Sequence, residues 1–363
     1  MQNRTLALSR MLPAESGGQR VDAALITSAP NRFYLTGFKS SAGYVLVTRE
    51  EAYLLVDFRY AEAAAAQVKD ARVRSFSKLS ETLAELISAY GLRGILLESG
   101  GVSLLEAERL GKMFEQAGAR AVKTSVLDEL LGGLRRVKSP GEIERIRAAQ
   151  QITEYAFGRI LEKIRPGVTE RELALDLEFD MRRQGADGVA FDLIVVSGVK
   201  SSLPHGEPGD KPLEKGDFIT MDIGARLAGY HSDMTRTVAL GSVSDEQRAV
   251  YDTVLRAQLT GLAAIRPGTL CGEVDRVVRS LIDSAGYEGC FGHSTGHGVG
   301  VEIHELPGLA PGNQTVLSPG MVVTVEPGVY LEGRFGVRIE DMVAVTADGC
   351  ENLTHVPKDL LTL

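Results

Sequence analysis

Four acidic side chains and one histidine in the second half of the sequence could do chemistry together. The acids stand in strand-like segments, and the histidine lies between glycines that permit close backbone approach: Asp222, Asp233, Glu326, Glu340 and His297. Burying a carboxylate costs several kcal/mol, and neighbouring carboxylates repel one another. Four acids can share the inside of a sheet only if some are protonated, if basic residues pair with them, or if cations lie between them.

Divalent cations are the alternative that these residue types favour. Two such ions offset four carboxylates, and one imidazole with several carboxylates suits Mn²⁺, Co²⁺ or Fe²⁺ better than a structural thiolate zinc site does. Two ions about 3.5–4 Å apart can bridge a hydroxide and polarise a carbonyl. A structural network of ion pairs stays open as the other interpretation, although the sequence offers mainly Arg236 and Arg338 as basic partners.

An internal repeat accounts for the pairing of the acids. The tetrapeptide Ile-Arg-Pro-Gly occurs at 164–167 and at 265–268, each time between two predicted helices. The strand-like segments 216–224 (GDFITMDIG) and 320–328 (GMVVTVEPG) also match and place Asp222 and Glu326 in the same register. We therefore predict a duplicated α-α-β-β unit after residue 136, with two equivalent halves around one antiparallel sheet covered by helices.

The strands that carry the acids follow from turn signals and from side-chain alternation. Asp222 and Asp233 are eleven residues apart (233 − 222), on either side of a predicted turn at 228–229. This spacing is typical of facing positions on the two arms of a hairpin. Side chains alternate along a strand, so Arg338 shares a face with Glu340.

The first third of the chain predicts a separate α/β domain, because strand-like and helix-like segments alternate there. The predicted strands are 43–48, 52–56, 71–76 and 94–98, and the predicted helices are 59–69, 80–90 and 104–117. The Gly-Gly pair within 130–137 predicts a connection, and a capping box at 139–142 begins a long helix that ends at 166–167. We expect an α/β domain over 1–132 and an α+β domain over 133–363.

Composition excludes several classes of function. The chain has 363 residues, 44% of them hydrophobic and 24% charged, as in globular proteins. Its net charge of 40 − 48 = −8 argues against nucleic-acid and membrane partners. No segment approaches the about 20 apolar residues of a membrane span, residues 1–12 lack the apolar core of a secretory signal, and the three cysteines form no CxxC pair. We therefore expect a cytoplasmic protein.

Five segments resemble the metal-ligand motifs of the Xaa-Pro peptidases, the aminopeptidase P and prolidase enzymes of the pita-bread fold. They are MDIGA (221–225), SDMTRT (232–237), HSTGHGVG (293–300), VEPGVY (325–330) and RIED (338–341). The segments PNRFYLTGF (30–38) and LLVDFRYAEAA (54–64) resemble the N-terminal domain that these enzymes share with creatinase. The resemblance implies two divalent ions, Mn²⁺ or alternatively Co²⁺, Zn²⁺ or Fe²⁺. Their ligands would be Asp222, Asp233, His297, Glu326 and Glu340.

The resemblance also implies roles for neighbouring residues. The catalytic residues would be His205, His304, Glu326 and Arg338, and the substrate-binding residues would be His205, His293 and His304. In this interpretation Glu326 takes the proton of the attacking water. His304 or His205 donates a hydrogen bond to the developing oxyanion, and Arg338 orients or neutralises Glu340.

These observations predict metal-dependent hydrolysis of the Xaa-Pro bond of small dipeptides, as in prolidase. Action on longer peptides, as in aminopeptidase P, is the main alternative. Arg32 and Arg59 favour the dipeptidase, because a cation must hold the free carboxylate of the proline. A methionine aminopeptidase, a metal-free creatinase-like amidinohydrolase and an inactive binding protein are less favoured, because the N-terminal domain, the RIED segment and all five ligand positions are present. The resemblance implies a homodimer.

Overall fold

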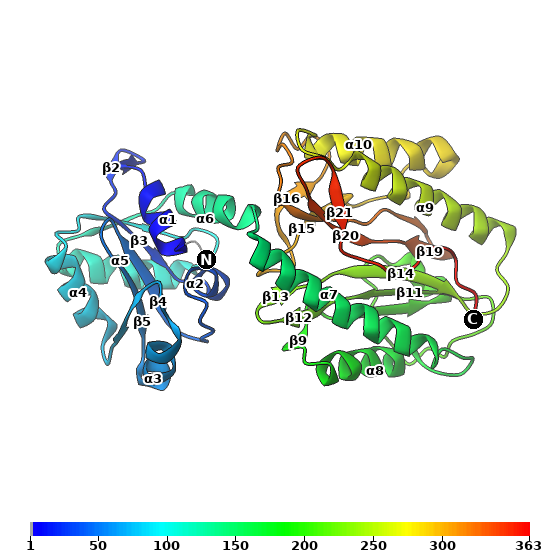
Figure 1. The fold of residues 1–363 in the computed structure, drawn as a ribbon, viewed down its shortest axis with the longest axis horizontal. Helices are drawn as coiled ribbons and strands as arrows, with labels where there is room; N and C mark the ends of the chain where they lie inside the picture. Colours follow the sequence, from blue (N-terminus) through cyan, green and yellow to red (C-terminus); the bar gives the residue numbers. More distant parts are fainter. Residues whose placement is uncertain (1–2) are drawn as a thin grey trace. The chain divides into compact units, whose positions relative to one another are not determined.

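The strands of the N-terminal part form one mixed sheet in the computed structural model, which describes residues 3–363 (Figure 1). Its strand order is β6-β5-β4-β3-β7-β8; β3, β4 and β5 are antiparallel, and the outer pairs are parallel. The strands are β3 (Ala23–Ile26), β4 (Tyr44–Thr48), β5 (Ala52–Val56), β6 (Arg72–Ser75), β7 (Gly94–Leu97) and β8 (Arg120–Val122), besides a short hairpin of β1 (Glu15–Ser16) and β2 (Gln19–Arg20).

Six helices accompany this sheet in the described residues up to Arg136. They are α1 (Arg4–Met11), α2 (Ala29–Thr36), α3 (Phe58–Gln67), α4 (Leu79–Ala89), α5 (Leu104–Gln116) and α6 (Val126–Arg136). Apolar side chains of α4, α5 and the central strands form one buried core on the sheet. The predicted alternation of strands and helices in this part is confirmed, with boundaries shifted by one or two residues.

The boundary between the two compact units falls at Arg135–Arg136, inside the predicted connection at 130–137, but the expectation of an irregular segment at the Gly-Gly pair was wrong, because these residues lie inside helix α6. Leu127 and Leu131 stand one turn apart on this helix and are buried, whereas Asp128 and Glu129 occupy its first turn, where acidic side chains favour helix formation. Burial of the leucine face therefore outweighs the low helix propensity of glycine.

The interpretation of Arg32 as a cation for a substrate carboxylate was also wrong. Its side chain is buried within the N-terminal unit and donates hydrogen bonds to the carbonyl oxygens of Thr27 and Ser40. Arg59 instead pairs with Asp57 at 2.7 Å and stays exposed. The guanidinium of Arg32 is thus bound to backbone carbonyl oxygens inside the unit and does not face a substrate.

The chain divides into two compact units, the first ending at Arg135 and the second beginning at Arg136. The second unit has outer helices around antiparallel strands (Figure 1). Its helices are α7 (Pro140–Leu161), α8 (Glu170–Arg183), α9 (Asp245–Ala264) and α10 (Cys271–Ile282), with the short turns η1 (Gly198–Ser202) and η2 (Asp283–Tyr287). The predicted capping box is present at the start of α7, and this helix ends at Leu161, before Pro166.

The predicted duplication is confirmed by the order of these elements. In the first half, α7 and α8 precede a sheet of order β10-β11-β14, whose strands are β10 (Ile194–Ser197), β11 (Phe218–Ile223) and β14 (Met234–Ala239). In the second half, α9 and α10 precede a sheet of order β16-β15-β17-β20-β21. Its strands are β15 (Gly296–Gly298), β16 (Glu305–Leu309), β17 (Val322–Val325), β20 (Asp341–Val345) and β21 (Cys350–Asn352). Strands β11 and β17 occupy equivalent inner places.

The predicted antiparallel arrangement is present, but the backbone hydrogen bonds divide the strands of residues 136–363 into four antiparallel groups. One of the two remaining groups contains β9 (Gly188–Val189), β12 (Ala225–Leu227) and β13 (Tyr230–His231). The other contains β18 (Gly328–Leu331) and β19 (Phe335–Arg338). Strand β14 meets the second half through isolated hydrogen bonds. Glu340 N–H donates to Thr235 O at 3.1 Å, and the Thr237 hydroxyl donates to Arg338 O at 3.0 Å. Threonine side chains here replace part of a backbone ladder.

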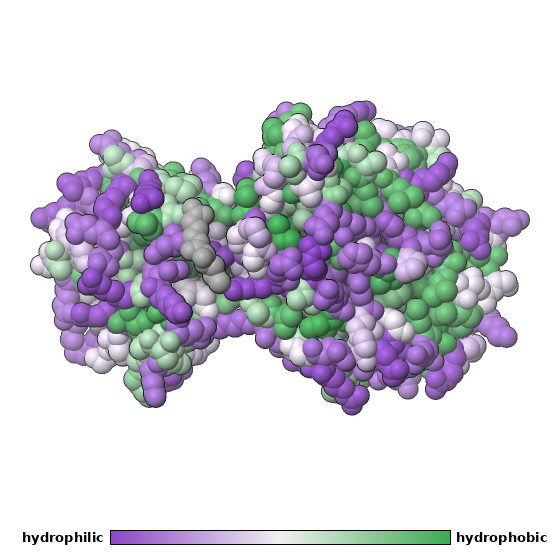
Figure 2. All heavy atoms as spheres, in the orientation of Figure 1, coloured by the Kyte–Doolittle hydropathy of each residue, from purple (hydrophilic) through white to green (hydrophobic). Residues whose placement is uncertain are grey.

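Hydrophilic side chains are spread over the visible face of each unit, with small apolar areas between them (Figure 2). Among the helices of residues 3–363, none combines the length and the apolar composition that a membrane span needs.

Helix α6 gives a direct test of the revised N-terminal structure. A methyl group at Gly133 meets no atom within 4 Å, so Gly133→Ala should raise the free energy of unfolding by about 0.5–1 kcal/mol. Urea unfolding measures the change. Gly118→Ala is the control and should be destabilising, because Gly118 has φ +83°. A loss of stability in Gly133→Ala would contradict a helix at this position.

Candidate metal centre

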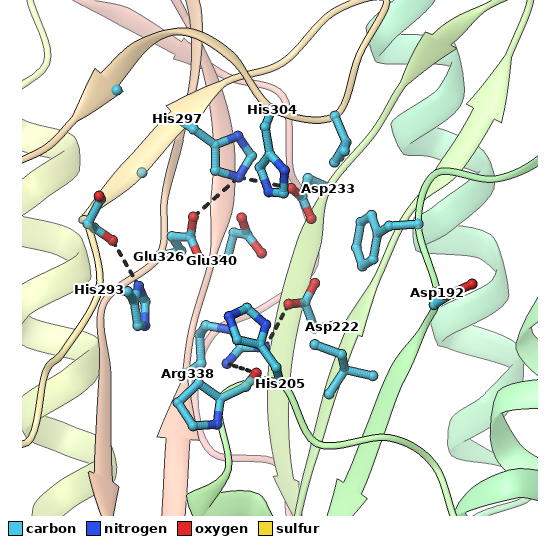
Figure 3. Close-up of a pocket in the computed structure, with 17 residues that line it drawn as sticks. Asp192, His205, Asp222, Asp233, His293, His297, His304, Glu326, Arg338 and Glu340 are labelled. Atoms are coloured by element: carbon cyan, nitrogen blue, oxygen red, sulfur yellow. Dashed lines mark hydrogen bonds and ion pairs between the residues drawn. The ribbon is translucent and has the colours of Figure 1, made fainter. Parts of the chain in front are cut away.

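Acidic and histidine side chains from both halves of the second unit line one cavity of about 480 Å³ (Figure 3). Asp222 lies near the end of β11, and Asp233 directly precedes β14. From the second half, His297 lies on β15, Glu326 directly follows β17, and Glu340 lies between β19 and β20. The structure therefore brings together all five residues for which the sequence predicts metal binding.

Three of the five come close enough to share one ion. Asp233, His297 and Glu340 each offer a ligand atom, and these atoms lie within 4.8 Å of one another. His297 Nε2 is 3.5 Å from Asp233 Oδ2 and 3.3 Å from Glu326 Oε1. Asp222 lies on the other side of this group, next to Arg338 (Figure 3).

The imidazole of His297 is held in the form that binds metals. Its Nδ1 lies 3.1 Å from the carbonyl oxygen of Gly298, which can only accept, so Nδ1 carries the proton. The lone pair of Nε2 then faces the acids. Burial lowers the pKa of His297 to about 4, so the ring is neutral near pH 7.

The carboxyl groups cannot all be ionised in this cavity without added positive charge. Burial, followed by repulsion from Glu340 and Asp222, raises the pKa of Asp233 well above its ordinary value. Burial and the charges of Glu326 and Asp222 raise the pKa of Glu340 in the same way. Burial also raises the pKa of Glu326 to about 8. Each shift reports the energetic cost of placing negative charge here.

Two carboxylate oxygens of this group lack a hydrogen-bond partner among the described residues. They are Asp222 Oδ1 and Glu340 Oε1, and both are buried. The other oxygen of Glu340 accepts from the Thr235 hydroxyl at 2.7 Å. Buried polar atoms are rarely left without a partner. Oxygen atoms of this kind beside a neutral imidazole are the donor set of a divalent cation.

Arg338 contacts Asp222, and not Glu340 as the sequence predicted. Its Nη2 donates to Asp222 Oδ2 at 2.6 Å, and its Nε donates to the Thr235 hydroxyl at 3.2 Å. Arg338 therefore reaches Glu340 only through Thr235. The other candidate cation, Arg236, pairs with Asp341 at 2.8 Å. A single guanidinium cannot balance four carboxyl groups. A purely structural network of ion pairs therefore does not explain this cavity.

The three other predicted histidines also line the cavity. The ring of His304 lies beside that of His297, with 4.4 Å between ring centroids. His205 lies next to Arg338 (Figure 3). His293 Nδ1 donates to Ser294 O at 2.9 Å, so its Nε2 accepts from the Tyr330 hydroxyl at 2.9 Å. Burial lowers the pKa of His293 to about 4.

Sequence reasoning missed two residues that support the site. The Tyr330 hydroxyl links His293 to Arg338, whose Nη1 donates to it at 2.8 Å, and the Thr235 hydroxyl links Arg338 to Glu340. Both residues lie inside the motif segments quoted above. Cross-strand pairing gives a signal for Thr235, because on β14 it lies directly opposite Asp222 of β11.

Comparison with known proteins assigns both parts of the chain. Residues 144–347 match the model of metallopeptidase family M24, and residues 12–148 match the creatinase/prolidase N-terminal domain. An Xaa-Pro dipeptidase from Pyrococcus horikoshii is 37% identical over 94% of this chain and 95% of its own length. The structure of an Xaa-Pro dipeptidase from Bacillus anthracis matches with a TM-score of 0.93 and 41% identity over 99% of each chain. An X-Pro aminopeptidase from Thermotoga maritima matches with a TM-score of 0.88 and 39% identity over 94% of this chain and 97% of the other.

The raised pKa of Glu326 predicts how the stability of the metal-free chain depends on pH. The folded chain keeps this proton up to a pKa of about 8, whereas the unfolded chain releases it near 4.5. Unfolding therefore becomes easier as pH rises between these values, and one pKa unit corresponds to about 1.4 kcal/mol. Glu326→Gln lacks this contribution, so its stability relative to the unaltered chain should increase from pH 5 to pH 8.

Urea unfolding with excess chelator at four pH values measures this difference. Comparison with the glutamine variant cancels the contributions of the histidines, which titrate in both proteins. Parallel pH profiles for the two chains would contradict a buried, protonated Glu326.

Proposed function

The chain belongs to metallopeptidase family M24, and we propose that it is an Xaa-Pro dipeptidase, a prolidase, which hydrolyses the bond before the proline of small dipeptides. One observation carries this proposal: five side chains of metal-ligand type from both halves of the second unit meet in one cavity. The similarity to the Xaa-Pro dipeptidases of Pyrococcus horikoshii and Bacillus anthracis supports the substrate class.

The cofactor that we propose is a pair of divalent ions, held by Asp222, Asp233, His297, Glu326 and Glu340. The buried oxygens without partners and the neutral imidazole of His297 fit such ions. The oxygen-rich donor set favours Mn²⁺, with Co²⁺, Zn²⁺ or Fe²⁺ as alternatives. When bound, such ions polarise the scissile carbonyl and lower the pKa of the attacking water.

The side chains around the ligands have separate proposed roles. Glu326 accepts the proton of the attacking water and passes it to the leaving nitrogen. His304 or His205 donates a hydrogen bond to the oxygen on which negative charge develops. His293 and His205 contact the substrate. Arg338 holds Asp222 directly and Glu340 through Thr235, which fixes the carboxylates before substrate arrives.

A second candidate function is the aminopeptidase P reaction on longer peptides. A neighbouring cavity of about 550 Å³ shares Asp192, Ile194 and His205 with the first one, so there is room for residues beyond a dipeptide. The similarity to the Thermotoga maritima X-Pro aminopeptidase supports this alternative. The match of residues 12–148 to the creatinase/prolidase N-terminal domain disfavours a methionine aminopeptidase.

We also propose that the enzyme is a cytoplasmic homodimer acting on small peptides. The three cysteines are free, which suits a reducing compartment. Sedimentation equilibrium of the purified chain measures the oligomeric state.

Removal of a central ligand should abolish both metal binding and activity. Asp233→Ala and Glu340→Ala each remove a carboxylate from the group that can share one ion, so bound metal and Ala-Pro hydrolysis should fall to the detection limit. Elemental analysis and a peptidase assay measure the two quantities. Asp348→Ala, an exposed acid in the turn after β20, is the control and should retain both. Full turnover in either ligand variant would refute the proposed ligand set.

The choice between the two functions depends on substrate length. With excess Mn²⁺, the kcat/KM for Ala-Pro should exceed the kcat/KM for Ala-Pro-Ala. A faster reaction with the tripeptide would instead support the aminopeptidase. Hydrolysis of neither peptide by the metal-loaded enzyme would refute both candidates.

A further inference from the structure

A further buried ion pair, besides Arg236–Asp341, lies in the same unit outside the metal centre. Lys138 Nζ is 3.3 Å from Glu305 Oε2, and the two side chains are only 1% and 3% exposed. Lys138 directly precedes the N-cap of α7, and its backbone N–H donates to Gly320 O at 2.8 Å. A buried ion pair often adds no net stability over apolar side chains, because both charges lose their hydration. Any contribution of this pair to function therefore acts through the chain segment whose position the pair fixes.

Glu305 organises the loop between β15 and β16. Its Oε1 accepts the backbone N–H of Glu302 at 2.9 Å, and Gly300 N–H donates to Glu302 O at 3.0 Å. Gly300 lies directly against the carboxyl group: a Cβ atom there would come within 2.6–2.8 Å of the Glu305 carboxyl atoms. Residues 300–305 are thus folded around the Glu305 carboxyl group. Its Oε1 accepts from the loop backbone, and its Oε2 pairs with Lys138.

This loop carries His304 into the cavity. His304 directly precedes Glu305 in the chain, and its ring packs edge-on against His297, with 4.4 Å between centroids and 77° between planes. Figure 3 shows the two rings side by side above the acidic group. A displacement of the Glu305 carboxyl group would therefore displace His304. In an active site, misplacement by about 1 Å can cost ~10²-fold in rate.

We propose that the Lys138–Glu305 pair positions His304 for the reaction. Glu305 fixes the backbone of the loop, Lys138 fixes the Glu305 carboxyl group, and the imidazole of His304 is thereby directed toward the scissile carbonyl. Lys138 and Glu305 are positioning residues, because neither lines the cavity itself. This assignment rests on the proposed peptidase function.

A double-mutant cycle tests whether Glu305 acts through His304. Glu305→Gln should lower kcat for Ala-Pro about 10-fold, with KM and bound Mn²⁺ unchanged. The same substitution should cost nothing further in a His304→Ala chain, because the group that it positions is already missing. Equal losses in both backgrounds would overturn the proposal.

A second comparison separates positioning from stability. Lys138→Met should reproduce the loss of kcat. The double variant, Lys138→Met with Glu305→Gln, leaves no unpaired buried charge. Its melting temperature should therefore be higher than that of either single variant, whereas its kcat should stay as low as theirs. Recovery of both quantities would show that the pair is only structural. Glu98→Gln is the control: Glu98 is a buried carboxyl group of the N-terminal unit that accepts backbone N–H bonds, so its loss should lower the melting temperature alone.

A measurement without substrate keeps this test independent of the proposed function. In the metal-free chain, NMR should detect a nuclear Overhauser contact between ring protons of His297 and His304, and Glu305→Gln should weaken it. An unchanged contact would overturn the positioning role. Absence of Xaa-Pro hydrolysis in the unaltered, metal-loaded chain would instead refute the proposed function and leave the NMR result to decide the position of His304.

Discussion

The second unit is built around an accumulation of negative charge that a protein interior cannot hold alone. Four carboxyl groups meet in one cavity with a single guanidinium among its lining residues. Burial and mutual repulsion raise the pKa values of Asp233, Glu326 and Glu340. Only bound protons or metal ions can neutralise the remaining negative charge of such a cluster. The neutral imidazole of His297 and the oxygens without partners favour metal ions.

The duplicated architecture explains how these groups come to face one another. Equivalent inner strands, β11 and β17, bring Asp222 and Glu326 to the cavity, and the following segments add Asp233 and Glu340. The halves are joined where β14 meets Glu340, by a backbone hydrogen bond at Thr235 and by the Thr235 hydroxyl. The same threonine also accepts from Arg338. The junction of the two halves and the support of the ligands are therefore one set of contacts.

Sequence reasoning succeeded where the information was local or periodic. The repeated tetrapeptide and strand alternation predict the duplication and the gathering of four acids and one imidazole. It failed where tertiary burial decides. Helix α6 tolerates its glycines because Leu127 and Leu131 are buried, and Arg32 is buried among backbone carbonyls. Alternation placed Arg338 on the correct face but could not select Asp222 as its partner. Lys138 and Glu305 are far apart in the chain, and no local pattern joins them.

The contact between Thr235 and Glu340 spans 105 positions of the sequence. During synthesis on the ribosome, the strands of the first half emerge well before the glutamate that completes the cluster. A nascent polypeptide thus presents Asp222 and Asp233 without Glu326 or Glu340, a pair of acids with little selectivity among cations. If the proposed ligand set holds the ions, their loading follows translation of the second half, so metal supply would act on the finished protein and not on the growing one.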